Sequence, residues 1–304
     1  MLSIPADFAR RMIELHGQAG AGWLRRLPAI VARCARRWSL RVLPPFEPLS
    51  YNYVAPATGA GGAALVLKVG YPHPELLAEI AALQLFKGRG IVRLLAADPG
   101  QGALLLEHLR PGQPLATLPD DERATAIAAG VMRRLWRPAP PPGHPFPTVQ
   151  QWAAGLKRLR HHFDGGSGPF PPRLVAAAEI HFAELAASAA EPVLLHGDLH
   201  HHNILSAERE PWLALDPKGL VGEPAYEAGA LLRNPLPQLL VQPEPGRILT
   251  RRATQLAEML GLDRERLIAW GMAQAVLSAW WSFEDHGHGW EGAIAVAQLL
   301  VTAK

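Results

Sequence analysis

Residues Pro192 to Asp216 read PVLLHGDLHHHNILSAEREPWLALD. Two short apolar runs enclose a polar loop, and the second run ends on an acid. The pattern predicts two β-strands that fix the loop between them. Within it, His196 lies two positions before Asp198, four residues separate Asp198 from Asn203, and Asp216 lies thirteen positions beyond Asn203. The stretch therefore predicts that two carboxylates and one amide lie on neighbouring loops.

This spacing favours phosphoryl transfer as the chemistry of the site. An aspartate must meet the attacking hydroxyl group and accept its proton, while hard oxygen ligands hold Mg²⁺ against the phosphates. We expect Asp198 to be the general base, and Asn203 and Asp216 to bind Mg²⁺. All three are candidate catalytic residues.

Length and composition set limits on the rest of the chain. A chain of 304 residues with 49% apolar and 19% charged residues predicts a folded protein of two lobes, with a cleft between them as the default place for chemistry. The formal charge of +3 is too small an excess to suggest a nucleic-acid partner. The basic stretch around Arg25 to Arg41 is interpreted as a solvated helix face, with an RNA or membrane contact as the minority alternative.

Cysteine content and hydropathy bear on the compartment. The single cysteine, Cys34, excludes an intramolecular disulfide framework and fits a reducing compartment, where a packing role is expected for it. The first residues lack the apolar core of a signal peptide, and no run approaches the ~18 apolar residues of a membrane span. We expect a cytoplasmic protein with no membrane partner. The sequence predicts no oligomeric state.

The first third of the chain has the pattern of a β-rich lobe. Short apolar runs separated by Gly and Pro predict a β-β-β-α-β-β order, with TGAGG as the turn of a hairpin and an amphipathic helix that begins with Pro. The predicted strands are 40–43, 51–55, 63–69, 91–96 and 103–107, and the helix is 74–86.

After Pro111 the pattern changes to helices. Residues 120–136 form an amphipathic segment with acids first and arginines last, as the helix dipole prefers. An extended proline run follows, then helices at 149–163 and 172–187, and helical sequence from Arg247 onward with a break at Gly261. We therefore predict an α+β protein with an N-terminal lobe at 1–108, including a helical extension and the nucleotide-binding sheet, and a mainly helical C-terminal lobe at 109–304 that carries the catalytic loop and the substrate site.

The predicted N-terminal lobe supplies candidate nucleotide-binding residues. Lys68 ends the apolar strand ALVLK, and a helix carrying acids follows, as in sites where a strand lysine holds the α- and β-phosphates. Glu79 is the expected ion-pair partner of Lys68, with Glu75 as the alternative. The segment LLLEHL would be the connection between the lobes, whose backbone at Glu107, His108 and Leu109 contacts the adenine.

Three segments together resemble the aminoglycoside and hydroxyurea resistance kinases, the group that includes the streptomycin 6-phosphotransferases. They are HGDLHHHNIL, LALDPKGLVGEPAYEAGALLRNP and ALVLKVGYPHPELLAEIAAL, and the similarity runs from about Phe46 to the final helix. The resemblance implies a protein-kinase-like two-lobed fold, an antiparallel sheet with one main helix in the first lobe, ATP and Mg²⁺ as cofactors, and phosphorylation of a hydroxyl group on a small, often cationic, substrate. A streptomycin-like aminoglycoside and hydroxyurea are the candidate acceptors.

Acidic and aromatic residues downstream of the catalytic loop are candidates for holding a cationic acceptor. Carboxylates bind guanidinium and ammonium groups, and tryptophan faces stack on them. The candidate substrate residues are Glu223, Glu227, Trp281, Glu284 and Asp285, with Trp280 as a second stacking face.

Two alternatives stay open on the sequence. In a metal-dependent hydrolase, two metal ions would be bound by His196, Asp198, His200, His201, His202 and Asp216. A catalytically silent nucleotide-binding protein is the second alternative, because the segment PFEPLSYNYV, which would cover the phosphates, contains no glycine. Neither a P-loop nor a dinucleotide-binding glycine motif is present.

Overall fold

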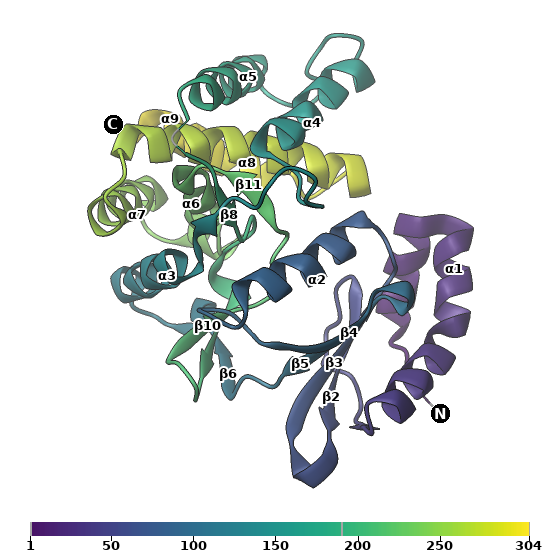
Figure 1. The fold of residues 1–304 in the computed structure, drawn as a ribbon. Helices are drawn as coiled ribbons and strands as arrows, with labels where there is room; N and C mark the ends of the chain where they lie inside the picture. The colour runs from purple at the N-terminus through teal and green to yellow at the C-terminus, as the bar shows by residue number, and fades with distance from the viewer. Residues whose placement is uncertain (1, 190, 304) are drawn as a thin grey trace. The chain divides into compact units, whose positions relative to one another are not determined.

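A five-stranded antiparallel sheet lies at the centre of the first of two units into which the chain divides, Met1–Gly112 and Gln113–Lys304 (Figure 1). The computed structural model describes residues 2–189 and 191–303. The strand order is β1-β2-β3-β5-β4, and every neighbouring pair is antiparallel. The strands are β1 (Arg41–Val42), β2 (Asn52–Thr58), β3 (Ala64–Gly70), β4 (Leu94–Asp98) and β5 (Ala103–Glu107).

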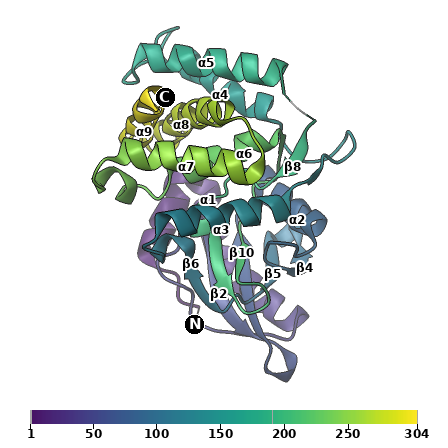
Figure 2. The same cartoon turned by 90° about the vertical axis from the view of Figure 1, so that its left-hand side faces the viewer.

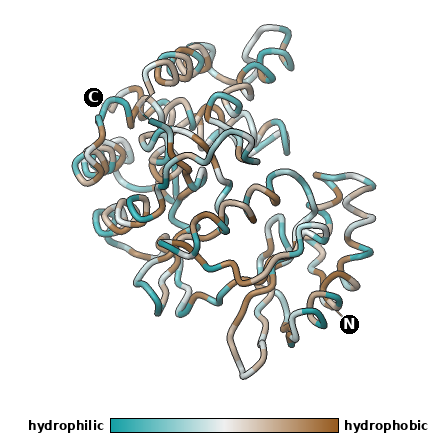
Figure 3. Tube along the Cα trace, in the orientation of Figure 1, coloured by the Kyte–Doolittle hydropathy of each residue, from teal (hydrophilic) through white to brown (hydrophobic). Residues whose placement is uncertain are grey.

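The element order of this sheet follows the prediction, with α2 (Pro74–Phe86) between β3 and β4. The β2–β3 turn is the TGAGG segment, where Gly61 and Gly62 take the left-handed conformation that favours glycine. The predicted strand 91–96 begins later, at Leu94, because two further left-handed glycines, Gly88 and Gly90, prolong the turn after α2. Figure 3 shows runs of hydrophobic residues along the strands of this sheet.

The long N-terminal helix α1 (Ala6–Arg37) packs one face against this sheet. Trp23, Leu27 and Val31 belong to a buried cluster with Tyr53 and Leu67 of the sheet. The helix is interrupted at Gly17, whose φ of 54° and ψ of −135° are not helical. Cys34 is buried in the same cluster, as its predicted packing role requires. The basic residues of this stretch are all exposed, which agrees with a solvated helix face: Arg25, Arg26, Arg33, Arg36, Arg37 and Arg41.

The second unit is mainly helical, as predicted. Its helices are α3 (Asp121–Leu135), α4 (Val149–His162), α5 (Pro172–Ala187), α6 (Pro224–Arg233), α7 (Pro245–Leu260), α8 (Arg264–His286) and α9 (Glu291–Thr302). Helix α8 carries Trp270 and Trp280, which are almost inaccessible to solvent. Figure 1 shows α8 along its length, and Figure 2 shows α7 along its length. The sequence predicted the break at Gly261 but missed the one at Gly287, where a second left-handed glycine ends α8, and it missed α6.

Two small three-stranded sheets support the polar loop of this unit. In one, β8 (Val193–Leu195) lies between β11 (Leu220–Gly222) and β7 (Arg137–Pro138). In the other, β9 (Ile204–Ala207) lies between β10 (Trp212–Ala214) and β6 (Pro111–Pro114). The sequence predicted β8 and β10 but not β9, which pairs with β10 in a short hairpin. Within the described residues, no helix has both the length and the hydropathy needed to cross a membrane.

Candidate active site

His196 connects the segment after β8, which carries Asp198, with the segment after β10, which carries Asp216. Its ring is fully buried, and Nε2 lies 2.8 Å from the carbonyl oxygen of Leu215. Its own carbonyl oxygen accepts hydrogen bonds from the backbone N–H groups of Lys218 at 2.8 Å and Gly219 at 3.1 Å. Burial lowers the pKa of His196 to about 4, so the ring is neutral near pH 7. The segment after β8 and the segment after β10 are thus joined through a residue that carries no charge.

Glu227 of α6 holds the backbone immediately before Asp198. Its two carboxylate oxygens accept hydrogen bonds from consecutive N–H groups, His196 at 2.7 Å and Gly197 at 2.9 Å. Burial raises the pKa of Glu227 to about 7, against the opposite effect of these two hydrogen bonds. The sequence prediction gave Glu227 a substrate role, whereas its contacts show a residue that positions the loop that carries Asp198.

Gly197 allows the loop to turn tightly. Its φ is +87°, and a Cβ atom at this position would lie 3.1 Å from Cβ of Leu220 and 3.3 Å from Cη2 of Trp152. A side chain here would be strained by both backbone conformation and crowding. The glycine brings the indole of Trp152 against the residue that precedes Asp198.

Asp198 and Asn203 are linked within one loop. Asn203 Nδ2 donates a hydrogen bond to the carbonyl oxygen of Asp198 at 2.9 Å, and its backbone carbonyl accepts one from Leu215 N at 3.0 Å. The Asp198 side chain is 30% exposed, and its Oδ2 lies 3.7 Å from Nε2 of His200. Burial lowers the pKa of His200, so this neighbour contributes no full positive charge near pH 7. The Asp198 carboxylate is therefore accessible.

The donor set around Asn203 and Asp216 fits a hard divalent cation. The hydrogen bond from Nδ2 fixes the amide of Asn203, and Oδ1 accepts no hydrogen bond from the described residues. Asp216 directly follows Leu215, which is bonded to Asn203, and has a φ of 57°. Aspartate tolerates this left-handed conformation better than most residues. Amide and carboxylate oxygens are the ligands that Mg²⁺ prefers.

Arg233, at the end of α6, lies near Asp198 and was missed in the sequence. Burial lowers the pKa of this arginine, while the negative charge of Asp198 acts in the opposite direction. Its Nη1 donates to Oε1 of Gln274 at 3.2 Å, and Gly229 provides the space for the Gln274 amide, which a Cβ atom there would approach to 2.4 Å. The segment LLRNP was part of the resemblance, but nothing local in it predicts that the arginine approaches Asp198.

The histidine run does not form the metal site of the hydrolase alternative. His201 is buried, and neither of its ring nitrogens has a hydrogen-bond partner among the described residues. Nε2 of His196 is occupied by a backbone carbonyl. In the described ranges 2–189 and 191–303, no group of three or more His, Cys, Asp or Glu side chains is arranged to hold a metal ion.

In the first unit, Lys68 pairs with Glu79. Nζ lies 2.7 Å from Oε1, and both side chains are less than 10% exposed, at 3% and 9%. Lys68 sits in mid-sheet, paired in register with Val54 and Leu104. Glu75, the alternative partner, is exposed in the first turn of α2. The burial of this ion pair shows that α2 and β3 fix the ammonium group together.

The predicted adenine-contacting segment follows β5. The backbone N–H of Glu107 donates to the carbonyl oxygen of Arg93 at 3.1 Å, and its Oε1 accepts from Arg93 N at 2.8 Å. The ring of His108 lies 5.9 Å from Phe46, and burial lowers its pKa. Leu109 is buried. A nucleotide role for these three residues stays a prediction.

The predicted substrate residues separate into two groups. Glu223 is buried and binds Arg266 at 2.8 Å and the indole of Trp270, so its carboxylate, like that of Glu227, serves the fold. Trp281, Glu284 and Asp285 instead lie together near the end of α8, where the two acids are exposed. Trp280, the other predicted stacking face, is buried.

Comparison with known proteins agrees with this architecture. A sequence model of the aminoglycoside/hydroxyurea antibiotic resistance kinases matches residues 44–287. Streptomycin 6-kinase of Streptomyces glaucescens is 32% identical over 302 residues, which cover 99% of this chain and 97% of that protein. Hydroxyurea phosphotransferase of Kitasatospora aureofaciens is 36% identical over 311 residues, which cover 99% of this chain and 86% of that protein.

Solved structures establish the protein-kinase-like fold. A thermostable mutant of an aminoglycoside phosphotransferase, in a ternary complex with ADP and hygromycin B, has a TM-score of 0.61 at 15% identity, over 88% of this chain and 97% of that one. Choline kinase from Streptococcus pneumoniae has a TM-score of 0.62 at 14% identity, over 91% of this chain and 98% of that one. The chain therefore belongs to the aminoglycoside/hydroxyurea antibiotic resistance kinase family, and it is a small-molecule phosphotransferase.

Proposed function

We propose that this protein transfers the γ-phosphoryl group of ATP to a hydroxyl group of a small molecule, with Asp198 as the general base and Mg²⁺ as the required ion. One observation carries the proposal: the Nδ2 hydrogen bond from Asn203 to the Asp198 carbonyl joins the two residues through the backbone. That bond leaves the carboxylate of Asp198 and Oδ1 of Asn203 for ligands. A general base and a cation ligand are thus held by one loop.

In this proposal the oxygen of the acceptor hydroxyl attacks the γ-phosphorus of ATP, the bond from that phosphorus to the β–γ bridging oxygen breaks, and ADP leaves. The carboxylate of Asp198 accepts the proton of the hydroxyl. Positioned general bases contribute about 10²- to 10⁴-fold to such rates. His196 and Glu227 do not touch the acceptor, because their polar atoms are engaged with the backbone. They hold the loop so that little reorganisation is needed when the acceptor binds.

Asn203 and Asp216 would hold Mg²⁺ through their side-chain oxygens. When bound, the ion supplies positive charge that neutralises the phosphate oxygens. Lys68, oriented by Glu79, would bind the α- and β-phosphates, and the backbone of Glu107, His108 and Leu109 would contact the adenine. We also expect a cytoplasmic location, where ATP is supplied.

A streptomycin-like aminoglycoside is the first candidate acceptor, and hydroxyurea is the second. Support comes from the relatives, a streptomycin 6-kinase and a hydroxyurea phosphotransferase that align with 99% of this chain. An ADP-release assay against streptomycin, other aminoglycosides, hydroxyurea and simple alcohols tests the proposal, with Mg²⁺ omitted as the control. Acceptor-dependent ADP release that needs Mg²⁺ is the expected result. Turnover of a substrate without ATP would instead support a hydrolase.

The variant Asp216→Ala separates an active kinase from a silent nucleotide-binding protein. If Asp216 holds the ion, the variant loses the Mg²⁺-dependent part of nucleotide binding, measured by calorimetry with and without Mg²⁺. Glu258→Ala, which removes an exposed carboxylate from α7, is the matched control and should bind as the native protein does. A native protein that binds the nucleotide but releases no ADP with any acceptor would favour the silent alternative.

A further inference from the structure

Two partly exposed tryptophans meet beside the catalytic loop. The ring centroids of Trp152, from α4, and Trp281, from α8, lie 5.2 Å apart with an interplanar angle of 87°. Perpendicular rings of this kind form a corner with two aromatic faces. Because Trp152 also packs against Gly197, the corner begins one residue from Asp198. We call Trp152 and Trp281 the aromatic corner.

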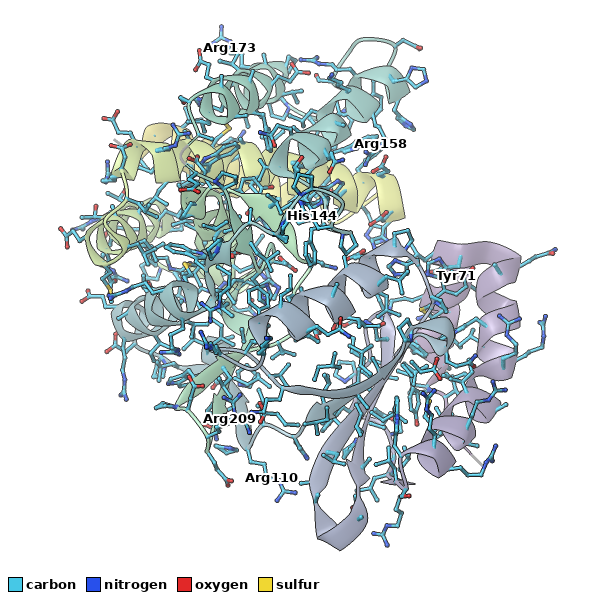
Figure 4. The ribbon with its side chains drawn as sticks, in the orientation of Figure 1. Tyr71, Arg110, His144, Arg158, Arg173 and Arg209 are labelled. Carbon is cyan, nitrogen blue, oxygen red and sulfur yellow. The ribbon has the colours of Figure 1, made fainter. Side chains whose placement is uncertain are left out.

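A close approach of helices α4 and α8 brings Trp152 and Trp281 together. Gly155 lies between them, and a Cβ atom there would approach Leu277 to 2.6 Å and Nε1 of Trp281 to 3.3 Å. Farther along, Arg158, labelled in Figure 4, binds both carboxylate oxygens of Glu284 at 2.7 and 2.8 Å. A bidentate pair fixes the relative orientation of the side chains that make it. The charge of Glu284 is thereby balanced within the protein.

Asp285 differs from Glu284 because its carboxylate has no hydrogen bond or ion pair to any residue in the described part of the chain. It lies four positions after Trp281, which places the two on the same face of α8. Burial raises the pKa of Asp285. The charges of His286, Arg158 and Lys218 act on this pKa in the opposite direction, and that of Glu284 raises it further.

We propose that the aromatic corner and Asp285 form the acceptor subsite and select a hydroxylated ring that carries a guanidinium group. A guanidinium plane can stack on an indole face while it donates hydrogen bonds to a carboxylate. The position beside Gly197 then brings a hydroxyl of the same ring toward Asp198. A small neutral acceptor such as hydroxyurea has no planar cation, and it is too small to contact this subsite and Asp198 at the same time. The inference rests on the proposed function for the identity of the reacting site.

Binding without turnover gives the first test. Streptomycin, which carries two guanidinium groups, is titrated against the full chain without nucleotide, and tryptophan fluorescence is recorded. We expect saturable quenching in the native protein and a dissociation constant about tenfold higher in Trp281→Leu. Trp281→Phe, which keeps a ring, should retain most of the affinity. Trp290→Phe is the control, since that ring contacts Phe170 at 5.1 Å.

Kinetics give the second test. In Asp285→Asn we expect the KM for streptomycin to rise on the order of tenfold with kcat changed less than about twofold, and the KM for hydroxyurea to stay within about twofold of the native value. Equal changes for both acceptors, or unchanged streptomycin binding in both Trp281→Leu and Asp285→Asn, would overturn the subsite. Saturable quenching that depends on Trp281 without phosphorylation of any acceptor would uphold the subsite and reject the proposed reaction. Phosphorylation of an acceptor that is unaffected by these variants would uphold the proposed reaction and reject the subsite.

Discussion

The loop of the second unit that carries Asp198 and the Lys68–Glu79 pair of the first unit hold their charged groups in different ways. In the loop, Glu227 and Asn203 bind backbone groups next to Asp198, so the carboxylate itself is left accessible. In the first unit, the ammonium group of Lys68 is held directly by a carboxylate and is nearly inaccessible. Hydrogen bonds to the backbone leave a side chain available for chemistry. A direct ion pair orients a charged side chain, but each of the two buried charges then depends on the other for its stability.

The largest expected effect comes from changing the accessible group without touching its support. Asp198→Asn keeps the shape of the loop but removes the proton acceptor, so we expect turnover to fall by at least ~10² while ATP affinity changes little. Steady-state ADP release and nucleotide titration measure the two quantities. Activity equal to that of the native protein would rule out Asp198 as the base.

The second effect tests the mutual dependence of the buried pair. Glu79→Ala removes the carboxylate that lies 2.7 Å from the buried ammonium of Lys68, and we expect a loss of about 3 kcal/mol in the free energy of unfolding, measured by urea denaturation. Gln84→Ala on the exposed face of α2 is the matched control. The double variant Lys68→Met with Glu79→Leu should recover much of the loss, because it removes both charges. A loss no greater than that of the control would contradict a structural dependence of α2 on this pair.

The third prediction concerns Glu227, which supports the loop, and the pH dependence of the free energy of unfolding. Since burial raises the pKa of Glu227 from an ordinary 4.5 to about 7, the folded protein binds this proton more tightly than the unfolded chain does. The stabilisation from its protonation is fully present below pH 4.5 and is lost as the pH rises through 7. The difference in unfolding free energy between the native protein and Glu227→Gln should therefore fall by up to about 1.4 kcal/mol per pH unit in this window. A difference that is independent of pH would mean that Glu227 keeps an ordinary pKa.

The smallest effect concerns His201, a buried loop residue whose two ring nitrogens make no hydrogen bond to the described residues. Replacing a buried polar group that has no partner by an apolar one of similar size removes its desolvation cost. We expect His201→Leu to raise the free energy of unfolding by about 1 kcal/mol near pH 7, measured by thermal or urea unfolding. Destabilisation by this variant would show that the ring makes a polar contact in solution.

The local sequence pattern was enough to predict those element boundaries that are marked by one residue or a short run of residues. Pro at the start of α2, the TGAGG turn and Gly261 each mark a boundary through backbone preference alone, and each boundary lies where it was predicted. Helix α6 was missed because its segment, PAYEAGALLR, is buried almost throughout and lacks the amphipathic period of a surface helix. Strand β9 was missed because its pairing with β10 depends on the hairpin rather than on its own composition.

The sequence by itself determined the order of elements and the one loop on which Asp198 and Asn203 must lie, because five positions in a short loop leave little freedom. Only the tertiary structure decided which distant charges approach that loop. Glu227 was predicted to bind substrate and instead holds two backbone N–H groups, while Arg233 and Trp152 were not predicted to approach it. The physical reason is that a carboxylate, a guanidinium or an indole acquires its role from the partners that packing brings to it, and local propensity carries no information about those partners.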